Sequence, residues 1–439
     1  MINRVDIIGG GISGLATAYY FSRRSNDVEI HVWERSSDPG GLAGTFPLNG
    51  ARVEKFYHHI FTRDWALREL IGELGLGNDL MWRRANTGAY YFGRPYRLST
   101  PLDLLRFTPL PLVSRFRLGW LALHARMIRD WQSLDDIPAR DYIIQTSGRR
   151  VYEVVWEPLL RGKFGVFADD VSAAWLWCKF VDRGGSRDAR GREVLGYVRG
   201  GLGAVFDRIV QYLRERGHSV HFNAPVVALE GTVSEIRTIV TASGSYRTDL
   251  VVAAAQTPDI APLLPSAAVS YAGALGRIRF LANVCLVMTL ERPLSDFYWT
   301  NVTDPSAPFV GIVEQTRWAD PSHYAGHNIA YISAYVTGDD RRLAVTADEL
   351  LAGYLPHIRK MFPEFEPSAV DSMVSWKASY AQPVVQVGYR ALVPPIRSPI
   401  GNLLLCTMAQ IYPHDRQVSN GVEMAKRTVD LMCANGRVR

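Results

Sequence analysis

The sequence has few cysteines and no cluster of basic residues, and each absence excludes a class of protein. The four cysteines lie far apart and fit no metal-binding or redox spacing, so we expect no metal and small apolar thiols of a reducing compartment. The 49 Lys and Arg residues outnumber the 43 Asp and Glu residues, but they are spread along the chain without an RNA-binding signature. We therefore expect no nucleic-acid partner and a mild attraction for anionic small molecules.

Long apolar runs are also missing, because no segment reaches the length of a membrane span. The nearest candidate, residues 104–131, is interrupted by five arginines, and helices flanking a substrate cavity explain it better than membrane contact does. Peripheral membrane association of this stretch stays open as the less favoured alternative. The chain begins directly with a strand-forming segment, so we expect no signal peptide and a cytoplasmic protein.

What the chain does contain is enough apolar residues for a large core. It has 439 residues, of which 47% are hydrophobic and 21% charged, and this is typical of a globular protein with two intertwined domains. No internal repeat or low-complexity segment interrupts it.

A dinucleotide-binding βαβ pattern opens the chain. Residues 5–8 form an apolar run typical of a buried parallel strand, and glycines at the following turn allow a phosphate to approach the start of a helix. A second strand over residues 28–33 ends in an acidic residue, at the distance from the last glycine where a carboxylate binds a ribose hydroxyl. The residues expected to contact the dinucleotide are Gly9, Gly11, Ile12, Ser13, Gly14 and Glu34.

A second glycine pair, Gly40 and Gly41, follows this unit. Residues 35–45 resemble the second glycine motif of the amine oxidase and protoporphyrinogen oxidase superfamily of flavoproteins, a continuation that NAD-dependent dehydrogenases lack. The resemblance implies FAD as the cofactor, with the backbone passing close to the pyrophosphate and the ribityl chain. The family usually has Arg where this chain has Leu42. The resemblance adds Arg35, Gly40, Gly41, Leu42 and Ala43 to the cofactor-binding residues.

Two later segments extend the resemblance. Glycines at residues 200–203 precede an amphipathic helix predicted over 204–216, followed by strands at 219–222, 225–229, 236–240 and 249–254. A strand is also predicted at 402–406 and a final helix at 418–432. In the superfamily these segments meet the adenine and the flavin. The resemblance therefore implies cofactor contacts at Val226, Val227, Met408, Gly421 and Val422.

These segments predict an α/β fold class. We expect an FAD-binding Rossmann-like domain built from the discontinuous segments 1–84, 198–265 and 398–436, and an α+β substrate domain built from 85–197 and 266–397. In the substrate domain the pattern predicts an aromatic hairpin turned at Gly93, strands at 280–290 and 309–313, a helix at 347–362 and a mobile loop at 182–193.

His59 is the first candidate for catalysis. It lies in a His-Ile-Phe run that resembles the loop of UDP-galactopyranose mutases placed against the flavin. A histidine there can hydrogen-bond the flavin N5 edge or relay a proton at neutral pH. Aromatic-like packing is the alternative for His59, and it is the favoured interpretation for His58.

The C-terminal loop and one strand supply the other candidates. Residues 407–416 lack the Gly-Asp found in most superfamily members, and the galactopyranose mutases lack it too. This loop contains Tyr412, which is the second candidate for catalysis. Asp415 and Arg416 either contribute to the site or form an ion pair with each other. Lys377 is a loose counterpart of the amine oxidase lysine that reaches flavin N5 through a water molecule.

Several further residues could shape the substrate site. Residues 156–165 resemble a cavity-shaping segment of the protoporphyrinogen oxidase-like branch, and Arg161, Lys163 and the arginines of 183–192 could meet an anionic substrate. A solvated basic surface is the alternative. Residues 298–299 and 314–315 either line the pocket or pack in the core.

The sequence therefore predicts an FAD-dependent oxidoreductase. We expect it to dehydrogenate a small polar metabolite of a biosynthetic pathway, such as a sugar or nucleotide-sugar, by hydride transfer to flavin N5, with oxygen or another acceptor reoxidising the flavin. The alternative is an isomerase resembling UDP-galactopyranose mutase, without net redox change. A non-catalytic FAD-binding protein is the third possibility.

Overall fold

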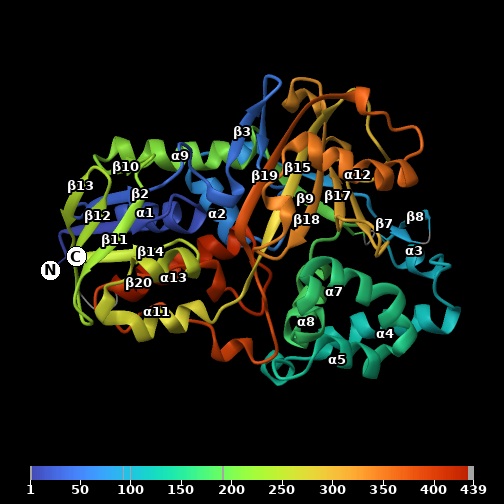
Figure 1. The fold of residues 1–439 in the computed structure, drawn as a ribbon, viewed down its shortest axis with the longest axis horizontal. Coiled ribbons are helices and arrows are strands. Elements are labelled where there is room, and N and C mark those ends of the chain that lie inside the picture. Colours follow the sequence, from blue (N-terminus) through green and yellow to red (C-terminus); the bar gives the residue numbers. More distant parts are fainter. Residues whose placement is uncertain (1, 92, 99, 190–191, 434–439) are drawn as a thin grey trace.

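A parallel five-stranded sheet forms the centre of one half of the molecule (Figure 1). The computed structural model describes residues 2–433 except 92, 99, 190 and 191. The strand order is β10-β2-β1-β14-β20, and all neighbours are parallel. The strands are β1 (Arg4–Ile8), β2 (Glu29–Trp33), β10 (Ser219–His221), β14 (Leu250–Ala253) and β20 (Leu403–Leu405). Three distant parts of the chain thus meet in one sheet.

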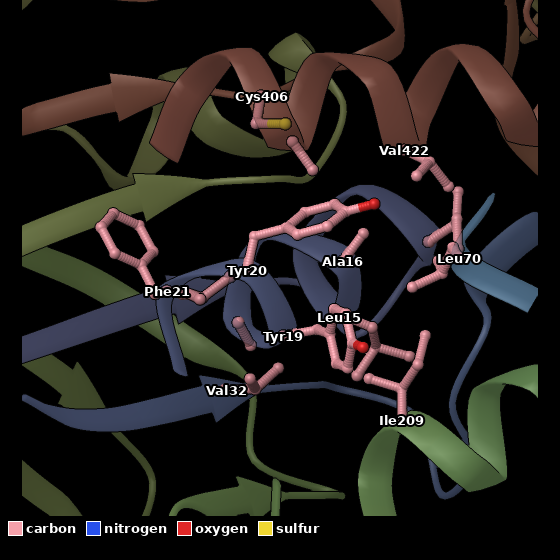
Figure 2. Packing of buried hydrophobic residues seen from close by; sticks show 14 of the residues in the cluster. Leu15, Ala16, Tyr19, Tyr20, Phe21, Val32, Leu70, Ile209, Cys406 and Val422 are labelled. Atoms are coloured by element: carbon pink, nitrogen blue, oxygen red, sulfur yellow. The ribbon is translucent and has the colours of Figure 1, made fainter. Parts of the chain in front are cut away.

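Helix α1 (Ile12–Arg24) is buried on nearly all sides because it packs between α13 (Val418–Cys433) and α9 (Gly201–Glu215). Figure 2 shows Tyr19 and Leu15 of α1 beside Ile209 of α9, with Val422 of α13 on the opposite side. The helix predicted from residue 204 begins three residues earlier, at the glycines themselves. α2 (Trp65–Glu73) packs on α13. This packing holds two helix N-termini, those of α1 and α13, close together.

Small antiparallel units extend this half. The strands predicted at 225–229 and 236–240 are confirmed, and with a third strand they form the meander β11 (Val226–Gly231), β12 (Ile236–Thr241) and β13 (Gly244–Arg247). Two further units are β3 (Thr45–Leu48) with β4 (Ala51–Glu54), and β5 (Ile60–Phe61), β9 (Val194–Val198) and β6 (Leu80–Arg84). The last unit carries the segment after His59.

A seven-stranded mixed sheet forms the second half, with α12 (Ala347–Met361) packed against it (Figure 1). The hairpin predicted at Gly93 is confirmed as an antiparallel pair, although Phe92 lies outside the described residues. In spatial order the strands are β19 (Val370–Pro383), β15 (Phe280–Leu290), β18 (Asn328–Val336), β17 (Gly311–Glu314), β16 (Trp299–Val302), β7 (Thr87–Tyr91) and β8 (Arg94–Arg97).

A group of helices stands beside this sheet (Figure 1). Its members are α3 (Pro101–Leu105), α4 (Leu112–Met127), α5 (Ala139–Ser147), α6 (Arg149–Val151), α7 (Glu157–Phe164) and α8 (Ala173–Gly184). The loop predicted at 182–193 is partly wrong, because α8 continues to Gly184; residues 190 and 191 lie outside the described chain. Among the described residues, no helix has the length and apolar character needed to cross a membrane.

Candidate functional site

The turn between β1 and α1 has room for a phosphate group. Gly9 has a φ of 107°, which few side chains tolerate, and a Cβ at Gly14 would overlap the carbonyl oxygen of Gly9. At Gly11, by contrast, nothing lies within 4 Å of where a Cβ would stand. Gly11 is also the N-cap of α1 and has no side chain that could accept hydrogen bonds from the first amides of the helix. These amides are therefore free to bind a ligand in this space. The geometry fits a pyrophosphate at Gly11, Ile12 and Ser13.

The second glycine pair completes this cradle. The amide of Gly40 donates to the carbonyl of Gly10 at 2.8 Å, and Gly11 and Gly40 form an isolated parallel bridge. A Cβ at Gly41 would stand 3.4 Å from the Cα of Gly11. Leu42 and Ala43 continue in a single 3-10 turn, with Ala43 buried and Leu42 on the wall of a cavity. The two glycine motifs therefore form one surface.

Glu34 is buried at the end of β2, where the βαβ pattern predicted a carboxylate. Its Oε2 accepts a hydrogen bond from the amide of Gly10 at 2.6 Å and its Oε1 accepts one from the amide of Ser36 at 2.8 Å. Each carboxylate oxygen can accept a further hydrogen bond, for example from a ribose hydroxyl. Arg35 turns away from this carboxylate and pairs with Asp259 at 3.1 Å.

The start of β11 lies beside Glu34, since the amide of Ala224 donates to the Glu34 carbonyl at 2.9 Å. The pairing of β11 with β12 is irregular between Val226 and Ala228, and the Val227 side chain is 54% exposed. This surface is open beside the carboxylate, which is where the resemblance places an adenine.

The N-terminus of α13 closes the other side of the cradle. A Cβ at Gly421 would lie 2.9 Å from Ile12 Cγ2 and 3.0 Å from Met408 Cε, so glycine at this position allows α13 to approach α1 closely. Val422 is fully buried beneath it. Helix N-termini carry a partial positive charge, and here two of them point to the same region.

A cavity of about 1100 Å³ begins beside this cradle, with Leu42 and Gln417 in its wall, and ends at α4. Most of its wall is apolar, and β16, α3, α4, α7 and α8 contribute about half of the aromatic and aliphatic side chains in it. Among the described residues, six cations and two carboxylates border it. These charged residues are Arg115, Arg126, Lys163, Lys179, Arg187, Arg416, Asp182 and Asp415.

His59 lies in the cavity wall near Leu42. Its Nδ1 is 3.0 Å from the hydroxyl of Tyr298, whose side chain is fully buried. The rings of Phe61 and Trp299 meet the imidazole edge-on, with centroids 4.8 and 6.1 Å away. These contacts fix the orientation of the imidazole at the cavity surface.

His58 also borders the cavity, so both imidazoles lie in its wall. Residues 57–59 are not in a strand; the first strand here begins at Ile60. The Nδ1–H of His58 donates to the Phe56 carbonyl at 2.6 Å. Burial in the cavity wall lowers the pKa of His58 to about 4, so this imidazole is neutral at physiological pH.

A charged cluster occupies the cavity wall next to the C-terminal loop. Lys163 Nζ lies 3.0 Å from Asp415 Oδ2, and Lys179 pairs with the same carboxylate. Burial opposes the ionisation of Asp415, but the two ammonium groups outweigh it and hold its pKa well below the usual range. Asp415 and Arg416 therefore do not form an ion pair with each other; Arg416 instead donates to Gln382 Oε1 at 3.0 Å and to the Tyr335 hydroxyl at 3.1 Å.

Sequence reasoning missed Lys179. Its neighbours Trp175 and Asp182 follow the i, i+4, i+7 spacing of one helix face, and all three line the cavity. That spacing is a usable signal, but the partner Asp415 lies 236 residues away and no local pattern connects them.

Tyr412 and Lys377, the other two residues predicted to be catalytic, lie outside the wall of this cavity. The Tyr412 hydroxyl donates to the carboxylate of Asp135, contacts Ser172 Oγ at 2.9 Å, and is absent from the cavity wall. Lys377 is exposed on β19, and its ammonium group donates a hydrogen bond to the carbonyl of Val345, which precedes α12 in the sequence. Strand alternation places Trp376 rather than Lys377 on the inner face, where its ring packs against Phe46.

Of the other residues proposed to shape the substrate site, some line the cavity and others do not. Arg161 is exposed and pairs with Glu157 and Asp169, so it is part of a solvated surface. Arg187 lines the cavity, while the predicted contributions of residues 190 and 191 lie outside the described chain. Trp299 borders the cavity, whereas the buried carboxylate of Glu314 accepts a hydrogen bond from the Leu294 amide at 2.7 Å.

The family model for flavin-containing amine oxidoreductases matches residues 12–432, nearly the whole chain. The chain belongs to this family. The resemblance to the amine oxidase and protoporphyrinogen oxidase superfamily that the sequence predicted is confirmed, and membership of this family implies a flavin cofactor.

Curated relatives of this family member include two bacterial enzymes. This chain is 23% identical over 258 residues to the coproporphyrinogen III oxidase of Staphylococcus aureus (strain NCTC 8325 / PS 47), and the match covers 52% of this chain and 54% of that protein. It is 27% identical over 281 residues to the coproporphyrinogen III oxidase of Mycobacterium tuberculosis (strain ATCC 25618 / H37Rv), covering 59% and 60%. The matches thus span little more than half of each relative.

Solved structures agree on the fold. A putative protoporphyrinogen oxidase from Exiguobacterium sp. 255-15 superposes with a TM-score of 0.78 at 19% identity over 99% of both chains. A reduced UDP-galactopyranose mutase superposes with a TM-score of 0.73 at 15% identity over 98% of this chain and 96% of that one. At such identities the likeness establishes the shared α/β architecture alone.

Proposed function

We propose that this protein is an FAD-dependent oxidoreductase that dehydrogenates a large, mainly apolar substrate carrying an anionic group. The observation that carries the proposal is the cavity beside the glycine cradle: it is spacious, mostly apolar, and bordered by an excess of cations. Its volume of about 1100 Å³ exceeds the usual range of about 300–1000 Å³ for small-molecule sites. An apolar wall of this size favours a bulky substrate over the small polar metabolite suggested by the sequence.

The cradle residues would hold FAD. In this proposal Gly9, Gly11 and Gly14 give the pyrophosphate access to the α1 amides, and Gly40 and Gly41 continue that surface. Bound FAD supplies the hydride acceptor of the reaction. The remaining contacts fall to Glu34 at the ribose, Val226 and Val227 at the adenine, Gly421 and Val422 near the start of α13, and Met408, which lies against Gly421.

In this proposal His59 handles a proton at the cavity surface. Tyr298 and Phe61 hold its ring, so the imidazole loses little conformational freedom when the substrate binds. Histidine can donate or accept at neutral pH, and its apolar neighbours exclude water from the exchange. His58 is neutral there and contributes no charge beside it.

The cationic cluster orients the substrate. The cations Lys163, Lys179 and Arg416 outnumber the carboxylates of Asp182 and Asp415, so an anionic substituent is attracted to this end of the cavity. The names of the curated relatives are consistent with this chemistry, because coproporphyrinogen III is a large macrocycle with carboxylate side chains. Porphyrinogens are therefore the first compounds to test.

The decisive experiment is anaerobic reduction of the holoenzyme's flavin, followed by absorbance. We expect bleaching with coproporphyrinogen III or another apolar acid, and none with putrescine or UDP-galactose. Reoxidation by oxygen or another acceptor then identifies the second substrate. If the dithionite-reduced protein interconverts UDP-galactose isomers over many turnovers without an acceptor, the isomerase alternative replaces this proposal.

A further inference from the structure

The outer face of α4 is apolar where a helix on the surface of a globular protein is normally polar. Eight of the fourteen exposed large hydrophobic side chains of the described residues lie on α3 and α4. On α4 they repeat at intervals of three and four residues and so share one face. These side chains, between 48% and 68% exposed, are Leu112, Val113, Phe116, Trp120, Leu123 and Met127.

The opposite face of α4 already has its partners inside the protein. Leu121 and Ala125 are fully buried and Ser114 is nearly so, and α4 packs on α5 and α8. The outer face is therefore a second apolar surface of the same helix, and the described residues leave about half or more of each of its six apolar side chains exposed. Contiguous apolar surface of this kind marks an interaction site.

Charge indicates what that partner is. Residues 104–129 contain five arginines and no Asp or Glu. In helical projection Arg115 and Arg126 border one edge of the apolar face of α4, and Arg117 borders the other. An apolar face flanked by cations on both sides is the arrangement of a helix that lies in the interface of an anionic lipid bilayer.

We propose that α3 and α4 dock this protein on the surface of an anionic membrane. α4 lies in the plane of the interface, with its apolar face among the acyl chains and its arginines at the lipid phosphates. This proposal favours the peripheral membrane association that the sequence left as the less favoured alternative for residues 104–131.

The position of the cavity relates this docking to substrate access. Phe116, Trp120 and Leu123 belong both to the exposed face and to the cavity wall, so the cavity reaches the surface at the docking face. An apolar substrate would then pass between bilayer and cavity without crossing water. This step rests on the proposed function, whereas docking itself does not.

Flotation of the holoenzyme with lipid vesicles tests the docking without any substrate. We expect binding to vesicles that contain phosphatidylglycerol, weaker binding to pure phosphatidylcholine, and loss of the difference at high salt. The double variant Val113→Ser/Met127→Ser removes two exposed side chains outside the cavity wall. It should weaken binding by about tenfold or more.

Two controls complete the experiment. Val233→Ser/Val269→Ser removes side chains of similar exposure far from α4 and should leave binding unchanged. Arg117→Gln/Arg129→Gln should weaken binding to phosphatidylglycerol vesicles about fivefold for each charge removed and leave binding to phosphatidylcholine alone unaffected. Flavin absorbance and melting temperature verify that every variant is folded.

The proposal is overturned if the wild type floats with neither vesicle, or if Val113→Ser/Met127→Ser binds as well as its control. Should the wild type ignore vesicles but self-associate in a manner that the same substitutions abolish, the occupant of the face is a second copy of the chain. Failure of flavin reduction by every substrate tried would refute the proposed function and leave the docking result standing.

Discussion

The cofactor end and the substrate end of the cavity are built from different parts of the polypeptide. At the cofactor end the surface is main chain: glycines of the β1–α1 turn and of residues 40–41 leave amides and open space. At the substrate end it is side chains, contributed by β16, α4, α7, α8 and the C-terminal loop. One added Cβ can block the first surface, whereas substitutions at the second should have graded effects.

The largest effect is expected for Gly11→Val. The backbone of Gly11 is extended (φ −74°, ψ 178°) and its Cβ position is open, so the apoprotein should fold normally. The valine side chain would occupy the space of the pyrophosphate and should lower FAD affinity by a factor of about 1000 or more. FAD binding to the refolded apoproteins, measured by flavin fluorescence, checks this.

Gly14→Ala is the matched control, because it meets the Gly9 carbonyl rather than open space. It should destabilise the apoprotein itself, seen as a lower melting temperature without cofactor. A yellow Gly11→Val protein with the affinity of the wild type would show that the pyrophosphate lies elsewhere.

The next effect concerns His59 at the boundary between the two ends. His59→Ala should retain FAD, because the cradle contacts lie on other residues, and should slow flavin reduction by a factor of roughly 100 to 10,000. Tyr298→Phe removes one neutral hydrogen bond to the ring, of about 1 kcal/mol, and should slow reduction about fivefold. His58→Ala should matter less, because its ring is tied to the Phe56 carbonyl. Stopped-flow measurement of the reductive half-reaction compares all three; wild-type rates in His59→Ala at full FAD occupancy would reduce His59 to a packing role.

The two ends also differ in how far the sequence predicts them. The β1–α1 turn, Glu34 and the glycine pair lie within 33 residues of one another, and their spacing reflects local backbone requirements. The predicted strands and helices of this half appear within a few residues of their expected bounds. Local physics therefore suffices for the element order and for the glycine cradle.

The substrate end depends on contacts between distant residues, which no local pattern encodes. Lys163 and Lys179 meet Asp415 across 252 and 236 residues. On β19, alternation separates Trp376 from Lys377, but which of the two faces inward depends on α12 covering the other face of the sheet. In the sequence, the exposed face of α4 is seen only as apolar residues among arginines. Which apolar residues of α4 are buried and which are exposed depends on the packing of α5 and α8 against the helix.

A graded effect on stability is expected for Asp415→Asn. The substitution leaves Lys163 and Lys179 close together without their shared anion and should lower the free energy of unfolding by about 1–3 kcal/mol. Asp296→Asn removes a carboxylate that is 92% exposed in its pair with Arg317, and should cost less than about 0.5 kcal/mol. Urea unfolding of the two variants measures the contrast.

The pH dependence of that difference has a defined sign. The pKa of Asp415 is held below its value in the unfolded chain, so the stabilisation is present above the unfolded value of about 3.9. It is lost as the pH falls through the folded pKa. The stability gap between wild type and Asp415→Asn should thus stay constant from neutral to mildly acid pH and close in strong acid. A gap that instead widened on acidification would contradict the assigned ion pairs.

The smallest effect on chemistry is expected for Tyr412→Phe. The Tyr412 ring packs against Trp131 and Tyr389, with ring centroids 5.4 and 5.1 Å away. Its hydroxyl forms hydrogen bonds with Asp135 and Ser172 outside the cavity wall. Loss of the hydroxyl should lower the free energy of unfolding by about 1 kcal/mol, because one hydrogen-bonding group is removed. Flavin reduction should stay within a factor of about two of the wild type, since no contact with the reacting atoms is lost. Unfolding and stopped-flow reduction of the same preparation separate the two roles: a large loss of rate at unchanged stability would return Tyr412 to the catalytic site, and would mean that side chains beyond the described cavity wall also reach the substrate.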